Sequence, residues 1–101
     1  MNLSIIIPVF NEESTILEIL HRVNALKKIC EIEIIVINDG SNDNSKKIIQ
    51  SNSQYYSKFI DLKKNSGKGR AVIEGIKNCT YEYLLIQDAD LEYDPQDIAT
   101  F

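Results

Sequence analysis

Four apolar runs divide the chain and predict strands. They cover residues 3–9, 32–37, 58–62 and 81–86. Apolar runs of this length, rich in β-branched side chains, suit strands that are covered on both faces, as in parallel sheets. Between the runs, apolar residues recur at helical spacing, which predicts a helix over 12–29 and shorter helices around Ile48 and Ile73. The chain therefore alternates strands with helices.

Polar residues between these runs indicate where the helices begin. Asn11 is the expected N-cap of the first helix, and either Ser41 or Asp43 is the expected cap of the second. After the fourth strand, an Asp-Pro pair predicts the start of another helix over 94–101, which is scarcely begun when the sequence ends. We therefore expect residues 1–101 to be part of a single domain that is truncated at its C-terminus.

The alternation of strands and helices predicts an α/β fold. Right-handed crossovers between successive strands build a Rossmann-like parallel sheet with helices on both faces. We expect the spatial order third, second, first, fourth strand, with the third toward the edge and the fourth buried. This order places the first and fourth strands side by side at a switch point, where open α/β sheets bind ligands. Residues 8–12, Asp39 and the segment 88–90 then border one crevice.

An acidic cluster directly follows the fourth strand. Asp88 and Asp90 are separated by one small residue, so both carboxylates can turn toward one hard cation, with a diphosphate supplying further oxygens. Asp39 ends the second strand, where its carboxylate can accept hydrogen bonds from a nucleobase or ribose. Taken alone, residues 88–90 also fit a simple acidic turn. Their place beside Asp39 at the same crevice favours a metal–diphosphate site.

The segment 65–71 is a second candidate for binding an anion. Gly67 and Gly69 allow backbone N–H groups to approach an anion at the start of a helix, and Lys68 adds positive charge. The segment matches neither the P-loop nor the dinucleotide-binding fingerprint. Taken alone, it is more simply interpreted as a plain helix start.

Composition excludes several classes of partner. The net charge of −4 provides no basic surface for nucleic acid or for an anionic membrane. No apolar run approaches the ~20 residues that span a bilayer, and the first residues lack the charged region of a signal peptide. We therefore expect a cytoplasmic protein, or the cytoplasmic face of a membrane for a longer form. Cys30 and Cys79 have no partner at ligand spacing, so we expect neither a zinc site nor a disulfide.

Motifs along the whole chain resemble those of one enzyme family. They are the segments 7–12, 38–43, 65–71 and 87–90. In order and spacing, the sequence resembles the family 2 glycosyltransferases. The segment 87–95 is most similar to the branch with dolichol-phosphate mannose synthase and the bacterial polyprenyl-phosphate sugar transferases. This resemblance implies the N-terminal, nucleotide-binding half of a GT-A fold, a nucleotide-diphosphate sugar donor, Mg²⁺ or Mn²⁺, and inversion at the anomeric carbon.

The resemblance also implies roles for particular residues. It implies Asp90 as the direct metal ligand, Asp88 beside the ribose, diphosphate or metal, and Glu92 as a further ligand. Asp88 and Asp90 are the candidate catalytic residues, because a metal held there neutralises charge on the leaving nucleoside diphosphate. Asn38 stands where many members carry an aspartate. The residues implied in donor nucleotide binding are Pro8, Phe10, Glu12, Asp39, Lys68 and Asp88.

The family resemblance leaves the donor and the acceptor open. It implies a UDP- or GDP-linked sugar, and a lipid-phosphate acceptor in the longer protein. In this superfamily the general base and the acceptor site lie beyond the point that corresponds to residue 101, so we expect residues 1–101 to bind donor without completing transfer.

Two other functions are compatible with the sequence. One is a non-catalytic nucleotide-binding or oligomerising module, since an unpaired sheet edge and exposed apolar surface favour self-association into a homo-oligomer. The other is a phosphatase of the haloacid dehalogenase type, which also carries Asp-x-Asp after a strand. In that class the motif normally follows the first strand, whereas here it follows the fourth.

Overall fold

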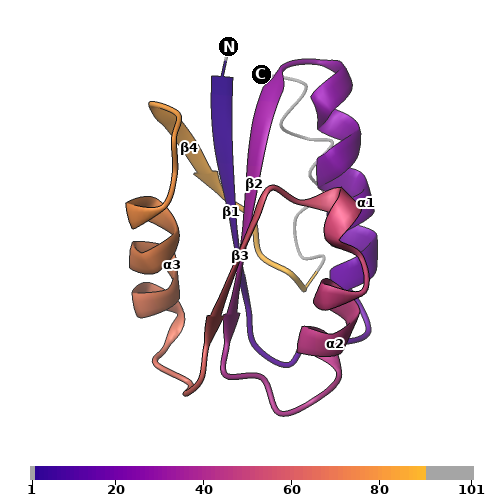
Figure 1. Cartoon of the computed structure of the whole chain (residues 1–101), viewed down its shortest axis with the longest axis vertical. Helices are drawn as coiled ribbons and strands as arrows, with labels where there is room; N and C mark the ends of the chain where they lie inside the picture. Colours follow the sequence, from indigo (N-terminus) through magenta and orange to yellow (C-terminus); the bar gives the residue numbers. More distant parts are fainter. Residues whose placement is uncertain (1, 91–101) are drawn as a thin grey trace.

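Four parallel strands form one sheet in the computed structural model, which describes residues 2–90 (Figure 1). They are β1 (Asn2–Val9), β2 (Glu31–Asp39), β3 (Lys58–Leu62) and β4 (Tyr83–Ile86). Their order in the sheet is β3-β2-β1-β4, and all pairs are parallel. The predicted sheet and strand order are therefore confirmed, and β1 and β4 meet at the switch point.

Helices cover both faces of this sheet, as predicted. They are α1 (Ile16–Ala25), which continues as the 3₁₀ turn η1 (Leu26–Lys28), α2 (Ser45–Gln50), the 3₁₀ turn η2 (Ser53–Tyr55), and α3 (Lys68–Lys77). Figure 1 shows α1 and α2 on one side of the strands and α3 on the other. The helix predicted over 94–101 lies outside the described residues.

The first helix begins later than the sequence pattern predicts. Asn11 is not its N-cap: it has a φ of 53°, a left-handed conformation that asparagine tolerates better than most residues but that cannot begin a helix. The N-cap position is instead Thr15. The prediction was wrong because the side-chain oxygen of Asn11 accepts a hydrogen bond from the distant N–H of Asn42, at 2.7 Å, rather than from its own helix.

The second helix also begins later, with Asn44 at the N-cap position rather than Ser41 or Asp43. Asp43 nevertheless accepts the first helical N–H, from Ser45, at 2.9 Å. Its other carboxylate oxygen accepts the N–H of Glu13 at 3.2 Å. Asp43 thus serves both its own helix and the loop that follows β1.

The two faces of the sheet are packed differently. On the α1 side, large aliphatic side chains fill a fully buried core: Ile5, Ile7, Val9, Ile16, Ile19, Leu20, Val23, Ile34, Val36 and Ile49. On the α3 side, the helix contacts the sheet through the small residues Ala71 and Gly75. A Cβ at Gly75 would lie 2.6 Å from Ile6 Cγ2, so only glycine allows α3 to approach this closely.

β4 is more exposed than its apolar sequence predicts. Tyr83, Leu84 and Ile86 are 59%, 40% and 43% exposed, and only Leu85 packs against the core. The prediction of a buried strand was wrong for the described residues, because β4 lies at the edge of the sheet and α3 packs on β1 and β2 instead. The segment still positions the acidic cluster, since β4 pairs with β1.

A buried carboxylate joins the amino ends of the strands. Glu33 of β2, only 9% exposed, accepts hydrogen bonds from Ser4 Oγ at 2.9 Å, Thr80 N at 2.7 Å and Thr80 Oγ1 at 2.8 Å. Lys58 Nζ lies 3.2 Å from Glu33 Oε2, the oxygen that also accepts from Thr80 Oγ1. Burial opposes ionisation, but these donors outweigh it and lower the pKa of Glu33 below its ordinary value. The carboxylate is therefore held charged and fully partnered.

The two cysteines, Cys30 and Cys79, are free and half-buried. In the part of the chain that the structure describes, no helix has the length and apolar character needed to cross a membrane.

Candidate functional site

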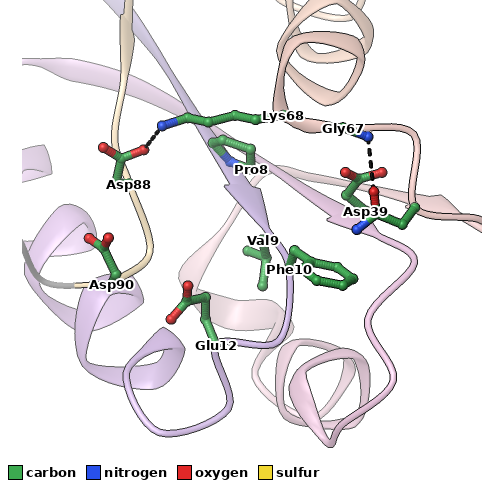
Figure 2. A pocket seen from close by; sticks show the side chains of 10 residues that line it. Pro8, Val9, Phe10, Glu12, Asp39, Gly67, Lys68, Asp88 and Asp90 are labelled. Atoms are coloured by element: carbon green, nitrogen blue, oxygen red, sulfur yellow. Dashed lines mark hydrogen bonds and ion pairs between the residues drawn. The ribbon is translucent and has the colours of Figure 1, made fainter.

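A cleft of about 300 Å³ opens at the carboxyl ends of the strands (Figure 2). Its lining residues are Pro8, Val9, Phe10, Glu12, Asp39, Asn65, Gly67, Lys68, Asp88 and Asp90. The structure thus brings together every residue that the sequence implied for the donor nucleotide, together with both aspartates implied for the metal. Glu92, the further implied metal ligand, lies outside the described residues. Val9 lies within the segment 8–12 that was predicted to border the crevice, and Asn65 and Gly67 lie within the candidate anion-binding segment 65–71, but none of the three was predicted to bind the donor nucleotide.

The loops after β1 and β2 hold each other through main-chain hydrogen bonds. The N–H of Asn11 donates to Ser41 Oγ at 3.0 Å, and the N–H of Glu12 donates to Ser45 Oγ at 2.9 Å. Because these partners are about 30 positions apart in sequence, local helix-cap rules could not identify them. The contacts fix the loop that carries Phe10 and Glu12 along one wall of the cleft.

Asp39 holds a second wall, the loop between β3 and α3. It is 3% exposed, and its Oδ1 accepts the N–H of Ser66 at 2.8 Å. The side chain of Asn65 accepts the N–H of Gly67 at 3.1 Å, which closes a tight turn. An Asn two positions before a Gly is the sequence signal that could have identified Asn65. One oxygen of Asp39 is thus occupied by the loop.

A glycine allows this loop to lie close to the end of β2. Gly40 has a φ of +67°, and a Cβ there would lie 2.6 Å from the carbonyl carbon of Lys64. Both the backbone conformation and the close approach therefore require glycine at this position.

Asn38 faces away from the cleft lining, beside the end of β3. Its Nδ2 donates to Asp61 Oδ1 at 2.9 Å, and Lys46 Nζ lies 2.9 Å from the other oxygen of Asp61. Burial opposes the ionisation of Asp61, but these two donors lower its pKa. An aspartate in place of Asn38 would set two carboxylates against each other, which explains the amide in this chain.

The acidic turn after β4 is held at its start by the sheet. The N–H of Gln87 donates to the carbonyl of Ile6 at 2.9 Å, which extends the pairing with β1 by one residue. Ala89 is 3% exposed and belongs to the hydrophobic core, while Asp88 and Asp90 on either side of it line the cleft. Lys68 Nζ forms an ion pair with Asp88 (Figure 2).

Negative charge accumulates at this end of the cleft. Burial raises the pKa of Glu12, and the charges of Asp90, Asp43 and Asp88 raise it further, against the opposing effect of the nearby Thr15 hydroxyl. A carboxyl group that resists ionisation among other carboxylates indicates a site where an added cation is stabilising.

The donor set fits a divalent ion that is shared with a ligand. Within residues 2–90, no group of three or more His, Cys, Asp or Glu side chains could hold a metal ion. Asp88 and Asp90 supply hard carboxylate oxygens, the ligands preferred by Mg²⁺ and Mn²⁺, but they leave most coordination positions to other oxygens. A diphosphate bound in the same cleft is a suitable source of those oxygens.

Comparison with known proteins decides the family. The model of the family described as Glycosyl transferase family 2 matches residues 4–101. The chain belongs to glycosyl transferase family 2. The chain is similar to the poly-beta-1,6-N-acetyl-D-glucosamine synthase of Staphylococcus epidermidis, to which it is 42% identical over 93 residues. That match covers 91% of this chain but 22% of the relative, so the family 2 chain spans less than a quarter of that protein.

Solved structures agree with this assignment. S. aureus TarS 1-349 in complex with UDP-GlcNAc superposes with a TM-score of 0.80 at 26% identity, over 99% of this chain and 30% of that one. The mannosyltransferase PcManGT from Pyrobaculum calidifontis was solved with GDP-Man and Mn²⁺. It gives a TM-score of 0.77 at 21% identity, over 87% of this chain and 27% of the mannosyltransferase chain. The family 2 chain therefore has the Rossmann-like GT-A fold that its sequence predicted.

Proposed function

We propose that this family 2 chain forms the donor site of an inverting glycosyltransferase that uses a UDP-linked N-acetylhexosamine. The observation that carries the proposal is the convergence of the predicted donor and metal residues, from three strand ends and one helix start, on a single cleft. The choice of donor is supported by two similar proteins. TarS was solved with UDP-GlcNAc, and the S. epidermidis relative is named as a poly-N-acetylglucosamine synthase.

The two ends of the cleft suit the two halves of such a donor. At one end, Phe10, which is 41% exposed, offers an aromatic face to a base, and the second oxygen of Asp39 can accept a base or ribose hydrogen. At the other end, Lys68 and the two aspartates face the same space (Figure 2). We place the nucleoside between Phe10 and Asp39, and the diphosphate beside Lys68.

Lys68 has a specific part in this scheme. Its ammonium forms an ion pair with Asp88. A diphosphate brings two oxygen-rich groups into reach of the same ammonium, so Lys68 can exchange the carboxylate for a phosphate oxygen. In that position it stabilises the charge that develops on the leaving UDP as the sugar–phosphate bond breaks.

Asp88 and Asp90 are the residues that would hold the divalent ion. When bound, the ion supplies Lewis-acid stabilisation of the leaving diphosphate. The chain's own contribution is to keep both carboxylates at a fixed turn next to the diphosphate end of the cleft.

We propose a saccharide hydroxyl as the acceptor, following the name of the S. epidermidis relative. A hydroxyl needs a general base, which the family resemblance implies beyond the point that corresponds to residue 101, so we place the acceptor site outside residues 1–101. The lipid phosphate implied by the resemblance of residues 87–95 is already ionised and needs little such help. Transfer by the longer protein to a poly-N-acetylglucosamine acceptor, and not to a polyprenyl phosphate, would support a saccharide hydroxyl as the acceptor over a lipid phosphate.

Calorimetric titration tests the donor site directly. We expect UDP-GlcNAc to bind in the presence of Mn²⁺, and Asp90→Asn to weaken that binding by more than about tenfold, because even indirect ligand partners have effects of this size. Glu82→Gln is the matched control, since it removes the same charge from an exposed position. Equal binding by wild type and Asp90→Asn would contradict the metal role. Tighter binding of GDP-mannose than of UDP-GlcNAc would contradict the proposed donor.

A further inference from the structure

Thr15 occupies the N-cap position of α1 but does not cap it. No side-chain hydrogen bond from Thr15 satisfies its own helix. Its hydroxyl instead donates to the main-chain carbonyl of Ala89, 74 positions along the chain. A threonine at this position normally accepts an N–H of the first turn, so its hydroxyl here serves a different purpose.

The acceptor of this hydrogen bond is the residue between the two aspartates of the acidic turn. Ala89 is 3% exposed, and its methyl group lies in the hydrophobic core. On one side, the N–H of Gln87 continues the pairing of β4 with β1 at 2.9 Å. The hydrogen bond from Thr15 thus adds a second point of attachment, beyond the last pairing with the sheet, and holds the main chain from which Asp88 and Asp90 both project.

The same hydroxyl also lies close to the loop after β1. Thr15 Oγ1 lies 3.4 Å from Glu12 Oε2, and the Thr15 N–H donates to the carbonyl of Glu12 at 3.2 Å. Thr15 therefore links the loop after β1 to the turn after β4. These two segments meet only because β1 and β4 are neighbours in the sheet.

We propose that Thr15 is a positioning residue of the donor site, which fixes the spacing of Asp88 and Asp90 through the carbonyl of Ala89. The proposal rests on the proposed function of the cleft. Thr15 is not among the residues that line the cleft, so it acts on the ligands of a diphosphate–metal complex through the turn. A carboxylate pair whose main chain is held in advance loses less conformational freedom when it binds an ion.

Matched substitutions separate the hydroxyl from the shape of the side chain. Thr15→Val keeps the branched shape and removes the hydroxyl, whereas Thr15→Ser keeps the hydroxyl. We expect Thr15→Val to weaken Mn²⁺-dependent UDP binding by about tenfold, the lower end of the range for residues that orient metal ligands. We expect Thr15→Ser to bind UDP within about twofold of wild type, because the hydrogen bond to Ala89 is retained.

A second measurement does not depend on UDP. The carbonyl ¹³C resonance of Ala89 should shift in Thr15→Val and stay near its wild-type position in Thr15→Ser, because only the first loses the donor. Thermal unfolding followed by circular dichroism checks that each variant is folded. If Thr15→Val does not fold, Thr15→Ala provides a second variant without the hydroxyl.

The outcomes distinguish failure of this proposal from failure of the proposed function. No Mn²⁺-dependent UDP binding by the wild type would overturn the proposed function itself. Wild-type UDP binding by a folded Thr15→Val would overturn the positioning role, and so would an unchanged Ala89 resonance. Weakened binding by Thr15→Val, restored in Thr15→Ser together with the Ala89 resonance, would support it, since a purely structural defect would not follow the hydroxyl.

Discussion

The two ends of the sheet have opposite effects on the ionisation of their carboxyl groups. At the amino end, Glu33 is buried but receives hydrogen bonds from Ser4 and Thr80 and an ion pair from Lys58, and its pKa is lowered. At the carboxyl end, Glu12 is also partly buried but lies among other acids, and its pKa is raised by burial and by the charge of Asp90. The same side-chain type is thus stabilised by its surroundings at one end and destabilised at the other.

This difference separates stability from function. A fully partnered carboxylate contributes to folding, and in the described residues no buried side-chain nitrogen or oxygen lacks a hydrogen-bond partner. A cluster of acids weakens the free protein, but a cation and a diphosphate can relieve the repulsion when they bind. The amino end holds the strands together, and the carboxyl end carries the unfavourable charge that the proposed donor and metal would relieve.

Removing Glu33 should produce the largest loss of stability. Glu33→Ala leaves the N–H of Thr80 and the ammonium of Lys58 without their carboxylate, so we expect a decrease of about 3 kcal/mol in the free energy of unfolding. Urea denaturation measures this decrease. Glu31→Ala is the control, because Glu31 lies on the same strand and is exposed. Similar losses for both variants would show that the network is not the cause.

Adding one methyl group at Gly40 should destabilise the loops at the carboxyl ends of the strands. Gly40→Ala strains a φ of +67° and pushes against the carbonyl carbon of Lys64, so we expect a loss of about 2 kcal/mol together with weaker UDP binding. Gly67→Ala is a useful comparison, because its φ is +93° but no atom of the described residues lies within 4 Å of the added Cβ. If the two variants lose equal stability, backbone strain alone explains the effect and the close approach does not matter.

The pH dependence of stability should reveal the Glu33 network. A lowered pKa stabilises the folded state at pH values above the ordinary value of 4.5, and this contribution disappears as the pH falls through the lower pKa of the folded state. We therefore expect the difference between wild type and Glu33→Gln in urea denaturation to be largest near neutral pH and to shrink in acid. A difference that does not change with pH would argue against ionisation of Glu33 as its source.

Removing the charge of Glu12 should have the smallest effect on stability, and it should stabilise the protein rather than destabilise it. The raised pKa of Glu12 destabilises the folded state above that pKa, and this penalty vanishes as the pH falls below the ordinary value of 4.5. We expect Glu12→Gln to stabilise the protein by about 0.5 kcal/mol at neutral pH, within the range for relief of charge repulsion. Thermal melts of Glu12→Gln and of the exposed neighbour Glu13→Gln provide the test. A larger gain in Glu13→Gln would mean that net charge, rather than the cluster, sets the penalty.

Much of the cleft followed from the sequence, because the carboxyl ends of parallel strands meet at one edge. Asp39 and Asp88 each follow an apolar run, and that position alone predicted that they would lie near each other. The start of α1 could not be predicted in the same way. The apolar stripe does not reveal that Asn11 adopts a positive φ and accepts a hydrogen bond from Asn42.

The exposure of β4 could not be predicted from the pattern of apolar residues either. An apolar run indicates that a segment can be buried, but not whether another element covers it. The position of β4 at the edge of the described sheet, and the packing of α3 on β1 and β2, leave Tyr83 and Ile86 exposed.

The residue pattern was enough to predict the strands and helices, their order in the sheet and the polar residues at the strand ends, because hydrophobic periodicity and crossover handedness act over short stretches of chain. Which carboxylates are compensated could be read only from the folded chain. Glu33 finds Thr80 at a separation of 47 positions, and Asp39 finds Ser66 at a separation of 27. Hydrogen bonds and charge interactions depend on distance in space, and that distance is set only when all four strands have come together.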